Sequence, residues 1–224
     1  MHNSRLLLMQ QSVRFFGSMV FWTPVTIFSL LLIYNTLSYF SFSRDFSFIL
    51  ERQLLFEDGM YYTFFYVHIA AGVICIAASL VQFSSYILKR RKTIHVWSGK
   101  FYVLVVLLAG APTGLYMAFF AKGSFYERAL FLFMALFWFF TTWKGWSVIR
   151  KKQVLAHKIW MIRSYSMAMT AVTFRIYHLV FYMLGWDHLE NYELSLWISV
   201  IGNMLVAESV IWRKSKSYLK SFVS

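Results

Sequence analysis

The sequence predicts an all-α polytopic membrane protein: one bundle of six transmembrane helices over residues 1–224, with both termini in the cytoplasm. The chain is 59% hydrophobic, 21% aromatic and only 14% charged, which is more apolar than a soluble core of this size can hide. Several apolar runs also reach the roughly 20 residues that a helix needs to cross a bilayer. The net charge of +13 sits in short clusters between those runs, which argues against nucleic acid as a partner.

The predicted spans follow the apolar runs in order, at residues 19–40, 61–88, 99–121, 128–149, 158–184 and 194–212. The first run is too long for a secretory signal and has no small-residue cleavage site, so we expect it to be retained. The third run contains Pro112 between Gly110 and Gly114. Because proline removes a backbone hydrogen bond, a bend is expected there, which either shapes a cavity or fits a neighbouring helix.

The longest connection, residues 41–60, is expected to form an outer interfacial segment. Its apolar residues recur at helical spacing among charges, and they include Phe42, Phe46, Ile49 and Leu50. We interpret it as a connector between spans; a lid over an outward-facing site is the alternative. No composition shift marks a separate soluble domain.

Charge predicts the orientation of the bundle. Residues 89–100, 150–158 and 213–220 are strongly basic and fall on one side, which the positive-inside rule assigns to the cytoplasm. Most acidic residues fall on the opposite side: Asp45, Glu51, Glu57, Asp58, Glu127, Asp187, Glu190 and Glu193. Glu208 is the remaining acid, and its depth along the helix predicts a structural ion pair with Arg163.

Histidines lie near both ends of the predicted spans in pairs of matched depth, His68 with His178 toward the outer face and His95 with His157 toward the inner face. A neutral imidazole is a common ligand of haem iron and a costly group to leave in lipid. Small residues beside these histidines indicate gaps between helices. We therefore expect haem b, with His68 and His178 as outer axial ligands and His95 and His157 as an inner set. Arg175 is the expected partner of a haem propionate.

The spacing of the histidines leaves the number of haems open. His157 and His178 lie about 30 Å apart along a straight helix, which is far for two haems that exchange electrons. A single outer haem is one alternative, and a quinone between two haem sites is another. A purely structural role for the same residues is the other alternative: the helices pack closely, and the histidines form hydrogen bonds between them.

Two other functions compete with electron transfer. A non-redox assembly subunit would use the small-residue seams and the aromatic surface to bind a membrane protein partner or a second copy of the chain. A proton-coupled transporter would use His68, Arg175 and His178 as a relay. If the protein is an enzyme, a membrane oxidoreductase is expected, since no paired nucleophile and base or phosphate-binding loop appears. The lone Cys75 lies within a span and gives no disulfide framework.

Several strings in the chain carry a family resemblance: FYVHIAAG around His68, QF at Gln82, HVWSGKFY from His95, HKIWMIRS from His157, and Arg175. Together they resemble a bacterial family of predicted multi-pass membrane proteins of unknown function, over about residues 60–180. The resemblance implies a bacterial inner-membrane protein and brings no assigned reaction. The six-span layout with four histidines also resembles dihaem cytochrome b type transmembrane reductases. In those proteins four helices supply the ligands, whereas here the fifth span would supply two and the fourth none.

Overall fold

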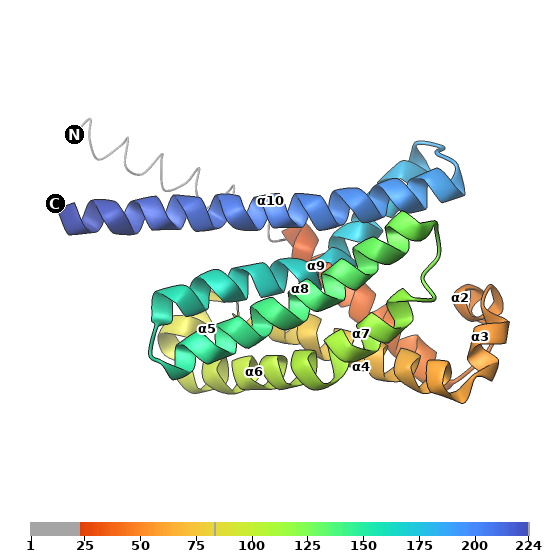
Figure 1. The fold of residues 1–224 in the computed structure, drawn as a ribbon, viewed down its shortest axis with the longest axis horizontal. Helices are drawn as coiled ribbons and strands as arrows, with labels where there is room; N and C mark the ends of the chain where they lie inside the picture. The colour runs from red at the N-terminus through yellow and green to blue at the C-terminus, as the bar shows by residue number, and fades with distance from the viewer. Residues whose placement is uncertain (1–22, 83, 224) are drawn as a thin grey trace.

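The all-α prediction is confirmed. The computed structural model describes residues 23–82 and 84–223, and this part of the chain contains helices and no strand. Long helices run side by side along the molecule, and the short helices α2 and α3 gather at one end (Figure 1). Residues 19–22 of the first predicted span lie outside the described residues, and its helix runs over residues 23–38.

The outer connection folds into short helices that pack against the bundle. After the turn η1 (Tyr39–Ser41) come α2 (Ser47–Leu50) and α3 (Gln53–Glu57). Phe48 stacks on Phe65 of the next helix with ring centroids 5.5 Å apart, and Phe56 meets the same ring edge-on at 4.9 Å. Ile49 and Phe56 are buried. The segment is thus anchored to the end of the bundle by aromatic contacts, which contribute beyond their buried area.

The second predicted span divides into two helices. α4 (Gly59–Gln82) ends before the predicted limit, and α5 (Ser85–Arg90) starts anew, because Ser84 caps it by accepting a hydrogen bond from the backbone N–H of Ile87. α6 (Lys92–Val105) then begins earlier than the predicted third span. His95 therefore lies inside a helix rather than before one.

A π-helical turn interrupts the third span where a bend is predicted. This turn, η2 (Val106–Gly110), separates α6 from α7 (Ala111–Ala118). It precedes Pro112, whose missing N–H already interrupts the helical hydrogen bonds, and single π-helical turns often occur at functional sites. Two glycines allow close packing here. A Cβ on Gly110 would lie 3.1 Å from Trp138, and a Cβ on Gly114 would lie 3.0 Å from His68.

A capping box starts the next helix, α8 (Phe125–Arg150). The Ser124 side chain accepts from the backbone N–H of Tyr126, and Glu127 accepts from the Ser124 backbone N–H at 2.8 Å. Glu127 is buried, and its other oxygen accepts from Trp197 Nε1 at 3.0 Å. Glu127 therefore links α8 to the helix that carries Trp197. The sequence analysis had grouped it with the acidic residues of the outer side.

α9 (Val154–Met183) and α10 (His188–Val223) complete the bundle. α9 packs against α4, α8 and α10, so its polar side chains meet protein on several sides. In the described part of the chain, five helical segments are long and apolar enough to cross a membrane: Thr23–Ser41, Gly59–Gln82, Lys92–Ala118, Phe125–Arg150 and His188–Arg213. α9 is absent from this group although it is 30 residues long, because charged and hydroxylated residues lower its hydropathy. The count of six spans and the cytoplasmic termini remain predictions.

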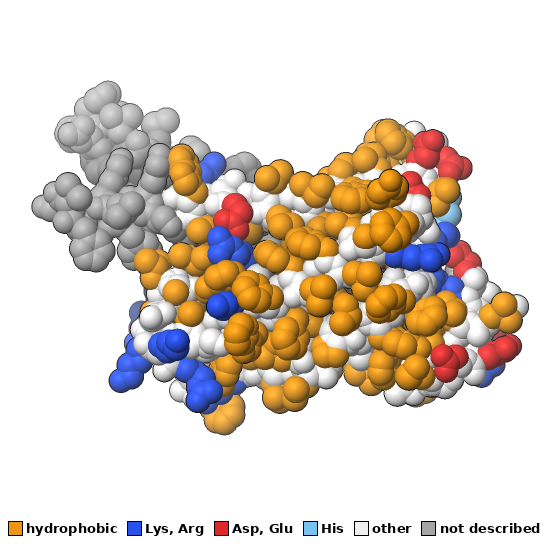
Figure 2. Space-filling model, viewed as in Figure 1, with side chains coloured by type: hydrophobic (Ala, Val, Ile, Leu, Met, Phe, Trp, Pro, Cys, Tyr) orange, Lys and Arg blue, Asp and Glu red, His pale blue; other side chains and the backbone are white. Residues whose placement is uncertain are grey.

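The surface has the charge distribution of a membrane protein. A broad band of hydrophobic side chains covers the middle of the molecule, with many of the basic residues at one end and most acidic residues at the other (Figure 2). Large exposed apolar side chains of the long helices include Leu104, Leu108, Phe133, Leu136 and Leu205. Such a contiguous apolar surface requires lipid around it.

Candidate functional site

A cavity of about 430 Å³ lies among the helices toward the end of the molecule that carries α2 and α3. Its wall comes from α4, η2, α7, α8, α9 and α10, together with the first helix and the connections at residues 39–58 and 119–124. Many lining residues are small, which leaves the space open: Gly72, Gly110, Gly114, Ala118, Ala121, Ala135, Ala168 and Ala171. The volume and the mostly apolar lining are typical of a small-molecule site.

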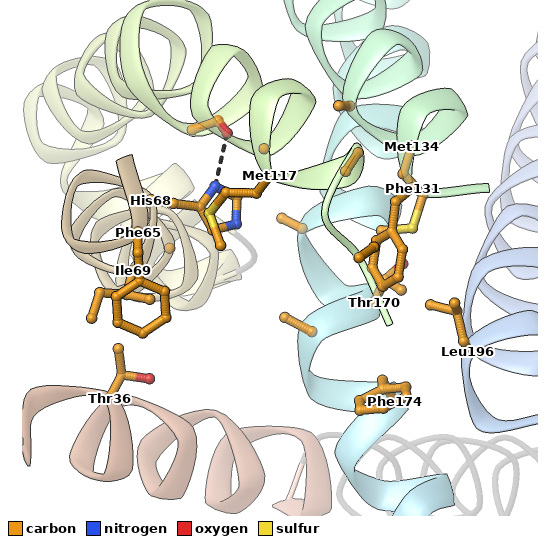
Figure 3. Close-up of a pocket in the computed structure, with 18 of the residues that line it drawn as sticks. Thr36, Phe65, His68, Ile69, Met117, Phe131, Met134, Thr170, Phe174 and Leu196 are labelled. Carbon is orange, nitrogen blue, oxygen red and sulfur yellow. Dashed lines mark hydrogen bonds between the residues drawn. The ribbon is translucent and has the colours of Figure 1, made fainter. Parts of the chain in front are cut away.

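His68 lies in the cavity wall and is held in one orientation by α7 (Figure 3). Its Nδ1 lies 3.1 Å from the carbonyl oxygen of Gly110 and 3.2 Å from Thr113 Oγ1. The Thr113 hydroxyl donates its only hydrogen to the Ala109 carbonyl at 2.6 Å, so its oxygen can only accept from the imidazole. Both partners of Nδ1 are therefore acceptors, which assigns the proton to Nδ1 and leaves the lone pair on Nε2.

His178 does not line this cavity. Its ring stacks on Phe174, which does line it, with centroids 5.6 Å apart. On another side His178 meets the ring of His188 at 5.9 Å, and its Nδ1 is buried with no hydrogen-bond partner among the described residues. The structure thus brings His178 together with His188, whereas His68 faces the cavity.

The inner histidines, His95 and His157, lie in the first turns of α6 and α9, respectively. His157 Nδ1 lies 2.9 Å from the carbonyl oxygen of Gly145, which can only accept, so this imidazole also keeps its lone pair on Nε2. The Nδ1 atom of His95 is buried without a hydrogen-bond partner among the described residues. Neither ring lines the cavity at His68.

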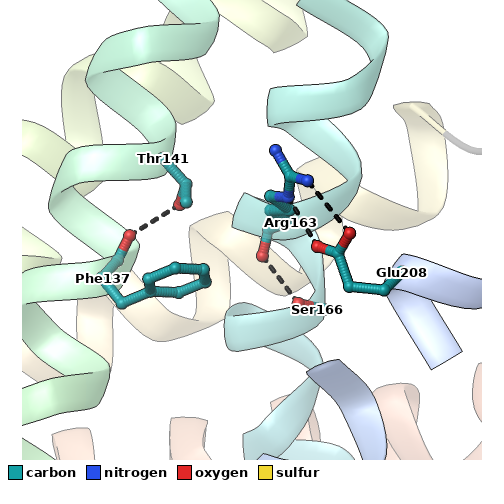
Figure 4. Close-up of polar contacts among 5 residues, drawn as sticks. All are labelled: Phe137, Thr141, Arg163, Ser166 and Glu208. Carbon is teal, nitrogen blue, oxygen red and sulfur yellow. Dashed lines mark hydrogen bonds and ion pairs between the residues drawn. The ribbon is translucent and has the colours of Figure 1, made fainter. Parts of the chain in front are cut away.

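Arg175 lies in the cavity wall on α9 and donates through Nη1 to the Ala171 carbonyl at 2.8 Å. The ion pair predicted for Arg163 is present: its Nε lies 2.6 Å and its Nη2 3.0 Å from the two carboxylate oxygens of Glu208 (Figure 4). This two-point contact satisfies both charges within the apolar band. Arg163 is thereby engaged in structure, whereas Arg175 has most of its N–H groups left for a ligand.

The sequence analysis missed two cavity residues, Arg52 and Lys122. Both come from outer connections. The sequence signal that could have indicated them was a positively charged residue within or next to an apolar segment, at the end of the molecule that carries most acidic residues. It also missed a buried polar cluster beneath the cavity. There the Tyr102 hydroxyl bonds Ser164 Oγ at 2.8 Å and accepts from Trp138 Nε1 at 3.0 Å.

Comparison with known families now adds to this geometry. The family model described as "Predicted membrane protein (DUF2306)" matches residues 65–211, which is more than half of the chain. The chain belongs to this family. No curated protein and no solved structure matches it. The DUF2306 match includes His68, His95, His157, His178 and Arg175 but begins after Arg52. The chain is thus an integral membrane protein of a family without an assigned reaction.

Proposed function

We propose that this DUF2306 protein is a b-type haem protein of the bacterial inner membrane that carries electrons across it. The observation that carries the proposal is the state of His68: Nδ1 is bound to backbone and hydroxyl acceptors, and the Nε2 lone pair is free at an apolar cavity. Histidines that ligate metals almost always donate their other ring N–H in this way, which fixes the tautomer and orients the ring.

The residues of the cavity fit the group. Haem is flat and mostly apolar with two carboxylates, and the cavity combines small and aromatic residues with cations. When bound, haem supplies one-electron redox chemistry that no side chain here provides. His68 would hold the iron, Arg175 would bind a propionate, and apolar residues would exclude water and so tune the reduction potential.

The inner histidines support a second ligand set. His157 has its Nδ1 fixed by the Gly145 carbonyl as His68 does by Gly110, and His95 was predicted at the same depth of the bundle. We propose His95 and His157 as the inner ligands. His178 remains our proposed partner for His68, and binding there requires its ring to move from behind Phe174 into the cavity. A quinone between the sites remains a further proposed cofactor.

An absorbance spectrum tests the proposal. Full-length protein from haem-replete cells should show reduced-minus-oxidised haem bands, and His68→Ala should lose the signal of the outer site. Glu190→Ala is the control, because Glu190 is an exposed residue at the start of α10 and lies outside the lining of this cavity. A colourless wild-type protein would reject the haem proposal and leave a proton-coupled transporter or an assembly subunit.

A further inference from the structure

The outer end of the cavity concentrates positive charge. Among the described residues, the charged side chains in its lining are Arg52, Lys122 and Arg175, and no carboxylate lines it. Three cations around one partly apolar space repel one another, which is costly in a membrane protein. An anion held between them would offset that cost.

Each cation is oriented by protein contacts that leave donors free. Arg52 donates through Nη1 to the Phe120 carbonyl and lies over the Phe48 ring, 5.1 Å from its centroid. Arg175 donates through Nη1 to Ala171. A guanidinium has five N–H donors, and the contacts of the described chain occupy one on each arginine, so both retain a fork that matches a carboxylate.

Lys122 contacts both a carboxylate and an imidazole. Its Nζ lies 3.3 Å from Glu51 Oε2 and 3.3 Å from His188 Nε2. Glu51 stands outside the cavity lining and is exposed, so its ion pair with Lys122 is of the kind that contributes little to stability. A ligand carboxylate at the cavity can therefore replace Glu51 at small cost.

We propose that Arg52, Lys122 and Arg175 form a clamp for the carboxylate groups of an amphipathic ligand, with Glu51 as the anion that this ligand displaces from Lys122. The apolar body of the ligand then points toward His68. The identification of the ligand as haem, with its two propionates, rests on the proposed function. The clamp itself requires only a carboxylate on an apolar body, which a fatty acid from the bilayer also provides.

Ligand binding to the full chain in lipid nanodiscs tests the clamp. The probes are haem and haem dimethyl ester, followed by absorbance, and oleate and methyl oleate, followed by calorimetry. Arg52→Gln and Lys122→Gln should each weaken haem binding about tenfold, the value of one charge-assisted hydrogen bond, and leave the ester unaffected. Glu51→Gln should leave haem binding unchanged or tighten it. Arg128→Gln is the matched control, since Arg128 is an exposed cation near the same end but outside the lining.

The outcomes separate the two proposals. If haem binds through His68 but Arg52→Gln and Lys122→Gln affect haem no more than its ester, the clamp is overturned and the haem proposal stands. If haem does not bind, but oleate does and loses affinity in both variants while methyl oleate does not, the haem proposal fails and the clamp stands. If neither carboxylate binds more tightly than its ester, the clamp is overturned.

Discussion

At the scale of single residues, the orientation of His68 depends on the absence of a side chain at Gly114. A Cβ there would lie 3.0 Å from His68 Cε1 and 3.4 Å from its Nδ1. We expect Gly114→Ala to push the imidazole away from its acceptor at Gly110. The substitution should lower the free energy of unfolding by about 1–3 kcal/mol, as overpacking of a close contact does, and should weaken ligand binding at His68.

Gly72→Ala is the control, because Gly72 also lines the cavity but a Cβ there would meet nothing within 4 Å. Alanine should be tolerated at this helical position and raise helix propensity slightly. Thermal unfolding of both variants in the same detergent gives the comparison. Equal stability of Gly114→Ala and Gly72→Ala would show that the imidazole has room to move and is not fixed by α7.

The sequence predicted well how deep a residue lies along its helix. It predicted poorly which way the side chain faces and which other helix it contacts. It found the pair of Arg163 and Glu208 because each is costly in lipid without the other. It did not anticipate that His178 lies outside the cavity. His178 is three residues, or roughly 4.5 Å of helical rise, beyond Arg175, the outermost α9 residue of the lining. Two residues at the same depth in different helices need not both line the cavity between those helices.

The sequence did not predict that Arg52 and Lys122 line the cavity, for another reason. They belong to connections, and a connection's path depends on tertiary packing rather than on periodicity. Arg52 reaches the cavity because the aromatic residues of α2 and α3 pack on Phe65. Of the four apolar residues on which the prediction of an amphipathic segment at residues 41–60 rested, Ile49 is buried, whereas Phe42 and Leu50 are exposed. Helical spacing alone could not show the surface on which the segment packs.

At the scale of elements, the π-helical turn in the third span sets the register between α6 and α7. A π-helical turn contains one residue more than an α-helix of the same path, and Leu108 in this turn is 72% exposed. We expect deletion of Leu108 to restore a regular helix and rotate α6 relative to α7 by about one residue, or 100°. Tyr102 would then lose Ser164, or His68 would lose Gly110.

Leu108→Ala keeps the register and removes only an exposed side chain, so it should change the free energy of unfolding little. The deletion should instead lower folded yield and thermal stability severely, because it leaves buried polar groups without partners. Size-exclusion chromatography and thermal unfolding of the two proteins measure this difference. A deletion variant as stable as Leu108→Ala would indicate that the turn is a passive irregularity.

The sequence predicts a helix boundary when local contacts set it, and fails when contacts distant in sequence do. Capping residues such as Ser84 and Ser124 start α5 and α8 through local hydrogen bonds, which makes those starts readable from sequence once the motif is recognised. α9 is harder, because its polar residues are stabilised by helices distant in sequence. Hydropathy alone cannot say whether such a helix crosses the membrane.

At the scale of the whole molecule, the topology depends on α9. If α9 crosses the bilayer, the connection at residues 151–153 and the connection at residues 184–187 lie on opposite sides. If α9 does not cross, both connections lie on the same side. The charge distribution predicts the first arrangement, with the basic connection before α9 in the cytoplasm.

Cysteine labelling in intact cells distinguishes these arrangements. The only native cysteine, Cys75, is 1% exposed, so it should not react with a membrane-impermeant maleimide and provides the unlabelled background. Lys151→Cys and Glu190→Cys introduce exposed thiols on either side of α9. We expect labelling of Glu190→Cys in intact cells and of Lys151→Cys only after permeabilisation. Equal labelling of the two variants would mean that α9 does not span the membrane, and reversed labelling would place the basic end outside, contrary to the positive-inside rule.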